Sequence, residues 1–185
     1  MEPAVFADLR ARLPAAAAAG VAHGVLVLEL GRDHVVPVMR ALKDDFAFDM
    51  LLDVTAVDWL PRTPRFEVVW HVYSTTHKAR VRVKTRVDEG DAAVDTLAPL
   101  YNAARYAERE CHDMYGIRFR GNDDLRALLL YEGFVGHPLR KDYPKDGEQP
   151  LIPMRDPARP ARTPLTTPRC RTPSARPSTR RPRGG

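Results

Sequence analysis

Apolar residues recur at helical spacing near the start of the chain and again after residue 35. The first group shares one helical face and consists of Val5, Phe6, Leu9 and Leu13. This stripe predicts a short amphipathic helix that ends at Pro14, and the alanine run at 15–19 extends or follows it. A second helix is predicted to open near Pro37 and to bury Val38, Ala41 and Leu42.

Shorter apolar runs predict strands between residues 25 and 87. The runs at 25–30, 50–57 and 66–73 are rich in Val, Leu, Trp and Tyr. From 79 to 87 the alternation is strict: valine and threonine take one side, and the other side carries Arg80, Arg82, Lys84 and Arg86. This pattern predicts a strand that is buried on one face only, and the short gaps between runs favour antiparallel connections.

Two more helices are predicted before residue 116. Asp91 is a suitable N-cap for a helix that reaches about Tyr101. The next helix spans about 102–115, and Gly116 is placed to end it. Its buried face is predicted to hold Ala103, Ala107, Cys111 and Met114. The order of elements predicts an α+β domain over residues 1–116, with a mixed or antiparallel sheet of about four strands and helices packed on one face.

Beyond residue 116 the periodicity fades, and the chain divides into two further segments. Residues 117–150 are irregular and charged, which predicts an extended segment that lies against a partner protein. Residues 151–185 hold 9 arginines, 8 of the 17 prolines and no aromatic residue, which is typical of a disordered tail. This tail accounts for the basic net charge of +5, because residues 1–150 hold 20 basic and 23 acidic residues.

The composition argues against most cofactor chemistry. Cys111 and Cys170 are too few for a disulfide framework or an iron–sulfur cluster. No glycine-rich nucleotide-binding motif follows a predicted strand. Glu108 and His112 lie four residues apart on a predicted helix and form a metal-ligand pair or, alternatively, ordinary surface charges. The missing cofactor motifs predict a cofactor-free protein. The lack of a secretory signal and of a membrane-spanning run predicts a protein of the cytoplasm.

Two ordered motifs between residues 108 and 144 resemble a known family. The first reads ERECHDMYGIRFRG at 108–121, and the second reads GFVGHPLRKDYP at 133–144. Both resemble the C subunit, of the 30 kDa subunit family, of the proton-translocating NADH–quinone oxidoreductase, which is respiratory complex I. The resemblance covers about residues 30–150. It departs from the family pattern at Asn122, Asp123 and Ala127, where the family usually has His, Pro and Arg.

The resemblance implies a non-catalytic subunit of the hydrophilic arm that carries no redox group. Such a subunit packs on the D subunit, near the B and I subunits, and supports electron transfer from NADH to quinone coupled to proton translocation. It would lie peripherally on the cytoplasmic face of the cell membrane, held there through the complex. Related subunits of membrane-bound hydrogenases, or of quinone reductases driven by ferredoxin or F420, are an alternative assignment.

The candidate site residues all belong to the matched motifs or to the segment between them. Four are expected to anchor the segment to a partner through charge-assisted hydrogen bonds: Arg126, Arg140, Lys141 and Asp142. Three more are expected to brace the fold internally: Glu108, Arg109 and Asp113. His137 and Tyr143 complete the second motif. For the first four, bracing of the chain's own fold is the open alternative.

A nucleic-acid-binding module is a further alternative. It would combine the basic strand face with the arginine-rich tail. The net acidic charge of residues 1–150 and the lack of interleaved aromatic residues on the basic strand argue against it. The sequence therefore predicts no nucleic-acid partner.

Overall fold

The computed structural model describes residues 3–12, 16–147 and 149. Its main sheet has five strands in the order β1-β2-β5-β4-β3. Their bounds are β1 Ala16–Ala22, β2 Val25–Leu30, β3 Met50–Asp58, β4 Phe66–Ser74 and β5 Ala79–Val87. β2 and β5 pair in parallel, and the other neighbours are antiparallel, so the sheet is mixed.

The remaining elements are short helices and a second, two-stranded sheet. Their bounds are α1 Val5–Arg12, η1 Arg32–His34, α2 Val35–Asp44, η2 Glu89–Asp91, β6 Ala93–Asp95, α3 Ala104–Tyr115 and β7 Arg118–Arg120. β6 and β7 pair in parallel and form the second sheet. None of the helices in the described part of the chain is long and apolar enough to cross a membrane.

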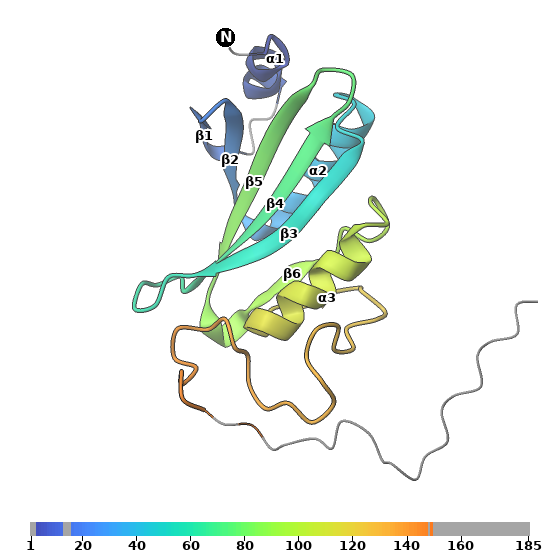
Figure 1. Ribbon diagram of the computed structural model, residues 1–185. Coiled ribbons are helices and arrows are strands. Elements are labelled where there is room, and N and C mark those ends of the chain that lie inside the picture. Colours follow the sequence, from blue (N-terminus) through green and yellow to red (C-terminus); the bar gives the residue numbers. More distant parts are fainter. Residues whose placement is uncertain (1–2, 13–15, 148, 150–185) are drawn as a thin grey trace, which may run out of the picture. The chain divides into compact units, whose positions relative to one another are not determined.

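One face of the main sheet is apolar and forms the core. Register places Val83 beside Leu28 on one side and Trp70 on the other, and Trp70 lies beside Val54. All four side chains are buried. Helix α2 lies behind β3, β4 and β5 in Figure 1, and its residues Val38, Met39 and Leu42 join the same core. The predicted α+β class, with helices packed on a mixed sheet, is confirmed.

The alanine run supplies a fifth strand, and the prediction that it could extend the first helix is wrong. His23 and Gly24 have positive φ angles of 53° and 75°, and this tight turn folds β1 back along β2. Pairing with the apolar strand β2 therefore overrides the helix propensity of alanine. Because the run has no strand-like alternation, sequence pattern alone did not reveal it.

The predicted helix from Asp91 to Tyr101 is also wrong. The Asp91 carboxylate pairs with the Arg32 guanidinium instead of capping a helix. The following residues form β6, whose pairing with β7 fixes an extended backbone. Helix α3 is confirmed, with Gly116 as its left-handed C-cap. Cys111 and Met114 are buried as predicted, whereas Ala103 is exposed and Ala104 is buried in its place.

Candidate functional site

Residues 121–147 form an irregular strap that follows β7 and contains no helix or strand. In Figure 1 the strap, coloured yellow to orange, loops around α3. Both sequence motifs meet here, because the first lies on α3 and β7 and the second lies in the strap. An irregular chain leaves its backbone N–H and C=O groups without regular partners, so the contacts that satisfy them determine its course.

Asp113 of α3 binds the backbone of the strap. Its Oδ2 accepts hydrogen bonds from the N–H groups of Leu128, Leu129 and Leu130 at 2.6, 2.9 and 3.3 Å. Burial acts to raise the pKa of Asp113, but these three donors outweigh it and hold the pKa below its ordinary value. A charged carboxylate thus fixes one turn of the strap.

Arg109, on the same helix, binds the preceding part of the strap. Its Nε and one terminal nitrogen donate to the carbonyl oxygens of Arg126 and Ala127, both at 2.9 Å. The guanidinium group also approaches Asp124 at 3.5 Å. Arg126 itself turns outward: its side chain is 82% exposed and pairs with Asp124. Arg109 thus contacts the backbone of Ala127, so this contact does not depend on the side chain at the position where the chain departs from the family pattern.

Glu108 is fully buried beneath the start of the strap. It accepts hydrogen bonds from the Thr96 hydroxyl at 2.6 Å, the Leu97 N–H at 2.7 Å and the Asn122 side-chain amide at 2.8 Å. Burial raises the pKa of Glu108, and the hydrogen bonds only partly offset this. Asn122, where the family usually has His, thus supplies a donor to this carboxylate. Asp123 pairs with Arg105 at 3.0 Å.

The second motif is fastened to the C-terminal end of α3. The Leu139 N–H donates to the Met114 carbonyl, His137 Nδ1 lies 2.8 Å from the Asp113 carbonyl, and Arg140 Nε donates to the Tyr115 carbonyl at 2.7 Å. These contacts satisfy helix carbonyls that have no partner within the helix. The Arg140 guanidinium also lies 5.2 Å from the centre of the Phe66 ring.

Gly116 makes this close approach possible. A Cβ placed on Gly116 would lie 2.5 Å from His137 Nε2 and 2.6 Å from an Arg140 nitrogen. The positive φ of 75° also favours glycine at this position. The glycine of the first motif is therefore required twice, once for the helix end and once for the contact with the strap.

The strap ends on an ionic cluster around Arg65, whose side chain is buried and which lies just before β4. Arg65 binds both carboxylate oxygens of Asp58, at 3.1 and 2.8 Å, and both of Asp142, at 3.1 and 2.7 Å. Glu89 also accepts from Arg65 at 2.6 Å. The Lys141 N–H donates to Asp58 Oδ2 at 2.9 Å. This cluster joins the end of the strap to the main sheet.

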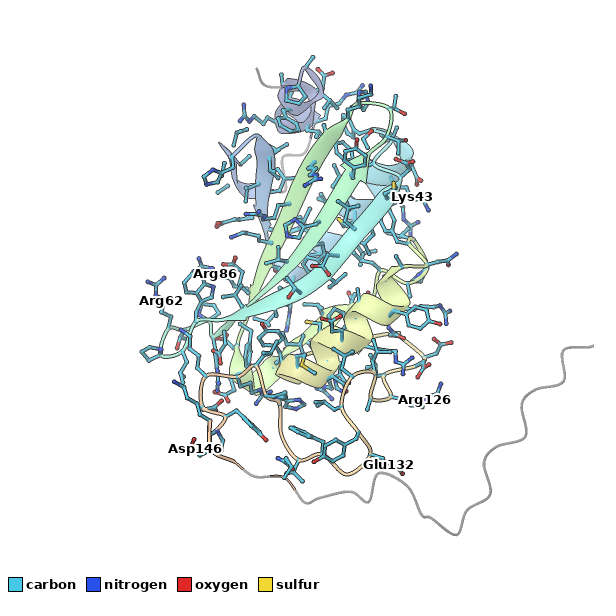
Figure 2. All side chains as sticks on the ribbon, viewed as in Figure 1. Lys43, Arg62, Arg86, Arg126, Glu132 and Asp146 are labelled. Carbon is cyan, nitrogen blue, oxygen red and sulfur yellow. The ribbon has the colours of Figure 1, made fainter. Side chains whose placement is uncertain are left out.

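Several side chains of the strap face outward. The labelled Arg126, Glu132 and Asp146 lie along its outer side in Figure 2. Tyr143 is half-buried, stacks on Phe134 with ring centres 6.0 Å apart, and its hydroxyl accepts from Gln149 at 2.6 Å. Five large apolar residues of the strap remain exposed: Leu128, Leu129, Tyr131, Val135 and Leu139. The strap therefore presents an apolar outer surface with charged groups beside it.

Within residues 3–12, 16–147 and 149, no group of three His, Cys, Asp or Glu side chains is placed to hold a metal ion. Cys111 is buried, and burial raises the pKa of its thiol. The interactions collected at the strap instead fix the position of a surface segment.

Comparison with known protein families shows which family the chain belongs to. Residues 28–149 match the model of the family described as "Respiratory-chain NADH dehydrogenase, 30 Kd subunit". The chain belongs to this family. The match contains the whole strap and both motifs, and it confirms the resemblance that the motifs indicated. The chain is accordingly a subunit of a multi-subunit oxidoreductase complex.

Relatives within the 30 kDa family are close in sequence. The C subunit of the NADH-quinone oxidoreductase of Citrifermentans bemidjiense is 42% identical over 124 residues, which cover 67% of this chain and 77% of that protein. The second C subunit of the Rhizobium meliloti NADH-quinone oxidoreductase is 45% identical over 130 residues, which cover 69% of this chain and 71% of that protein.

Two solved structures share the fold of this 30 kDa family member. A trypsin-resistant fragment of Nqo5 is 29% identical, with a TM-score of 0.56, and covers 65% of this chain and 96% of the fragment. A chain of a membrane-bound sulfane sulfur reductase, described as an archaeal respiratory membrane complex, is 27% identical, with a TM-score of 0.68. That match covers 76% of this chain and 84% of the other.

Sequence reasoning did not identify Asp58 and Arg65 as site residues, although the structure joins both to the second motif. Their signal is weak, because each lies at the end of an apolar strand run, where a charged residue commonly marks the surface. Both side chains are instead buried, with exposures of 2% and 5%. Only the fold brings Asp142 to within hydrogen-bonding distance of Arg65, 77 positions earlier in the chain.

Proposed function

We propose that this chain is a cofactor-free, non-catalytic C subunit in the hydrophilic arm of a proton-translocating NADH–quinone oxidoreductase. In this role it supports electron transfer from NADH to quinone by holding neighbouring subunits in place. The proposal includes a peripheral location on the cytoplasmic face of the cell membrane, maintained through the other subunits. The family membership and the relatives that are C subunits support the assignment.

The observation that carries the docking role is the two-sided character of the strap. Its inner side is fixed by Asp113, Arg109, Asp58 and Arg65, which satisfy its backbone and charged groups. Its outer side exposes the five apolar residues Leu128, Leu129, Tyr131, Val135 and Leu139. Exposed apolar patches with polar surroundings mark protein interaction sites. A rigid inner side also lowers the entropy cost of binding.

We propose the D subunit as the protein that covers this outer surface, with the B and I subunits nearby. Burial of Leu129 and Val135, which are 62% and 71% exposed, would stabilise the contact. Lys141 is an exposed cation at its border: its backbone N–H binds Asp58, and its side chain makes only one long, exposed hydrogen bond, to the Leu60 carbonyl at 3.5 Å. Arg126 is equally available at the other end of the strap.

Co-purification tests the docking role. The double variant Leu129→Ser/Val135→Ser in an affinity-tagged chain is expected to recover at least tenfold less D subunit from native membranes, with an unchanged melting temperature. Leu52→Ser is the matched control, since Leu52 is 45% exposed on β3, outside the strap. Equal recovery of the D subunit by the double variant and the control would refute docking through the strap.

The absence of a cofactor is tested on the purified chain alone. We expect no flavin or iron–sulfur absorbance, no stoichiometric metal and no oxidation of NADH. A stoichiometric cofactor, or turnover of NADH without partner subunits, would refute the assignment as a non-catalytic subunit.

A related complex with another electron donor is the second candidate, and the similarity to the archaeal sulfane sulfur reductase chain favours it. The strap would serve the same docking role there, because electron input depends on other subunits. Identification of the co-purifying proteins separates the two assignments. A flavin-binding NADH module supports complex I, and its replacement by a hydrogenase or ferredoxin-linked module supports the alternative.

A further inference from the structure

The polar face of the main sheet carries a row of cations that the strap does not use. β5 presents Arg80, Arg82, Lys84 and Arg86 on the face opposite the core. Register places Arg82 beside Val27 and Lys84 beside Glu29 of β2. The next strand, β1, continues these rows with Gly20 and Ala18. The surface therefore steps down from long cationic side chains on β5 to small side chains on the edge strand.

This step forms a hollow, which we call the cationic trough. One part is lined by β1 residues 18–22 together with Val27, Glu29, Arg82 and Lys84. A second part continues along β2 to Gly31 and reaches Arg86, and it shares Glu29 and Lys84 with the first. From residue 27 to 31 a strand rises roughly 13 Å, which is four steps of about 3.3 Å and the length of about four residues of an extended peptide.

The charges of the cationic trough are only partly balanced. Glu67, whose side chain is 3% exposed, pairs with Lys84 at 2.5 Å and with Arg86 at 3.6 Å. Within the described residues, Arg80 and Arg82 have no carboxylate partner. Among the residues that line the trough, the three cations Arg82, Lys84 and Arg86 face the two carboxylates Glu29 and Glu67, and an excess of one positive charge remains.

Arg82 also has an unused hydrogen-bond donor. Its Nε is buried and has no hydrogen-bond partner. A buried donor without a partner costs about 1–3 kcal/mol, and a carboxylate that draws the Arg82 side chain outward would give this Nε–H the partner that it lacks. The neighbouring His71 adds no charge near neutral pH, because burial and the nearby Arg82 lower its pKa. The cationic trough thus has an excess charge, an unsatisfied donor and room for a main chain.

We propose that the cationic trough binds an extended acidic segment of another protein, with one of its carboxylates on Arg82. The chain's own tail is a poor occupant, because residues 151–185 hold nine arginines and one acidic residue. Nucleic acid is disfavoured, since the lining offers alanine, glycine and valine but no aromatic ring on which bases could stack. A peptide carboxylate fits the fork of an arginine side chain.

A titration followed by NMR tests the proposal at single residues. The full chain, labelled with ¹⁵N, is titrated with a deca-glutamate peptide at 50 mM salt. The amides of Gly20, Val27 and Arg82 are expected to shift with one common, saturating Kd. Arg82→Gln is expected to raise that Kd at least fivefold, and Lys84→Gln, at a residue that lines both parts of the trough, gives a second test if the first variant loses its dispersed spectrum. Arg118→Gln, which removes an exposed charge on β7, is expected to leave the Kd unchanged.

Four outcomes would overturn the proposal. The first is a set of shifts confined to residues 151–185, which would show binding by the tail alone. The second is an equal loss of affinity in Arg118→Gln and Arg82→Gln, which would show attraction by net charge. The third is tighter binding of a deca-thymidine oligonucleotide to the same amides. The fourth is concentration-dependent shifts of these amides without peptide, which would show that a second copy of this chain occupies the face.

Discussion

Removal of the Arg65 side chain is the sharpest test of the ionic cluster that ends the strap. The Arg65 side chain is 5% exposed and lies among three carboxylates, of which Asp58 is 2% exposed while Asp142 and Glu89 are about half exposed. In Arg65→Ala, water can reach Asp142 and Glu89 at once. Asp58 keeps only the N–H donors of Leu60 and Lys141 and remains a buried charge without a cation.

The expected cost follows from these exposures. Loss of one partner from a buried ion pair destabilises a protein by about 3–5 kcal/mol, so Arg65→Ala is expected to lower the free energy of unfolding by that amount. Asp142→Asn is the matched variant at the exposed end of the cluster. A half-exposed ion pair contributes about 1 kcal/mol or less, so this variant is expected to lose no more than that.

Urea denaturation of the full chain, monitored by tryptophan fluorescence, measures both values. The pH dependence gives a second readout. Burial acts to raise the pKa of Asp58, but the hydrogen bonds from Arg65 and the backbone outweigh it and keep the pKa well below 3.8. The stabilisation by this pair is therefore present above pH 3.8 and is lost as the pH falls below it. The difference between wild type and Arg65→Ala should therefore narrow as the pH falls below 3.8.

Two results would refute this reasoning. A loss below 1 kcal/mol in Arg65→Ala would show that the cluster does not hold a buried charge. A loss in Asp142→Asn as large as in Arg65→Ala would show that the exposed end of the cluster contributes as much as the buried pair.

Three further predictions concern other contacts of the strap. Gly116→Ala is expected to lose at least 2 kcal/mol in urea denaturation, because the new Cβ meets His137 at 2.5 Å and the backbone φ is positive. Burial raises the pKa of Glu108 above 4.5, so its contribution to stability is greatest below pH 4.5 and falls as the pH rises through the raised value. The stability of wild type relative to Glu108→Gln, from melts between pH 4 and 8, should therefore decrease with rising pH. Lys141→Glu is expected to reduce co-purification of partner subunits with a change in melting temperature below 2 °C, since its backbone binds Asp58 and its side chain makes only a long, exposed hydrogen bond to the Leu60 carbonyl.

Each of these predictions has its own control. A substitution of Gly133, which has a positive φ but no atom near the added Cβ, should cost less than the same change at Gly116. A pH-independent difference between Glu108→Gln and wild type would contradict the raised pKa. Arg140→Glu should lower both stability and assembly, because its guanidinium binds the Tyr115 carbonyl. Equal thermal destabilisation by Lys141→Glu and Arg140→Glu would contradict the distinction between an outward and an inward cation.

The spacing of apolar and polar residues was sufficient to predict elements that have one buried and one exposed face. The strict alternation at 79–87 predicted β5, since period two with a charged face admits only a half-buried strand. The predicted helix that ends at Gly116 was confirmed for the same kind of reason. Pattern failed at Asp91 and at the alanine run, because backbone pairing with another strand decided both: β6, which follows Asp91, pairs with β7, and the alanine run pairs with β2.

The sequence by itself determined the α+β class, the family and the position of the segment that carries the candidate site. Ordered motifs and side-chain periods are local properties, so they can be read without coordinates. Only the tertiary structure decided which way each charged residue of the strap faces. The side chains of Arg140 and Asp142 bind the chain's own fold while the side chain of Arg126 turns outward, although all three are charged residues of the same irregular segment. The physical reason is that contact with a partner such as Arg65, 77 positions away, depends on the fold and leaves no trace in local spacing.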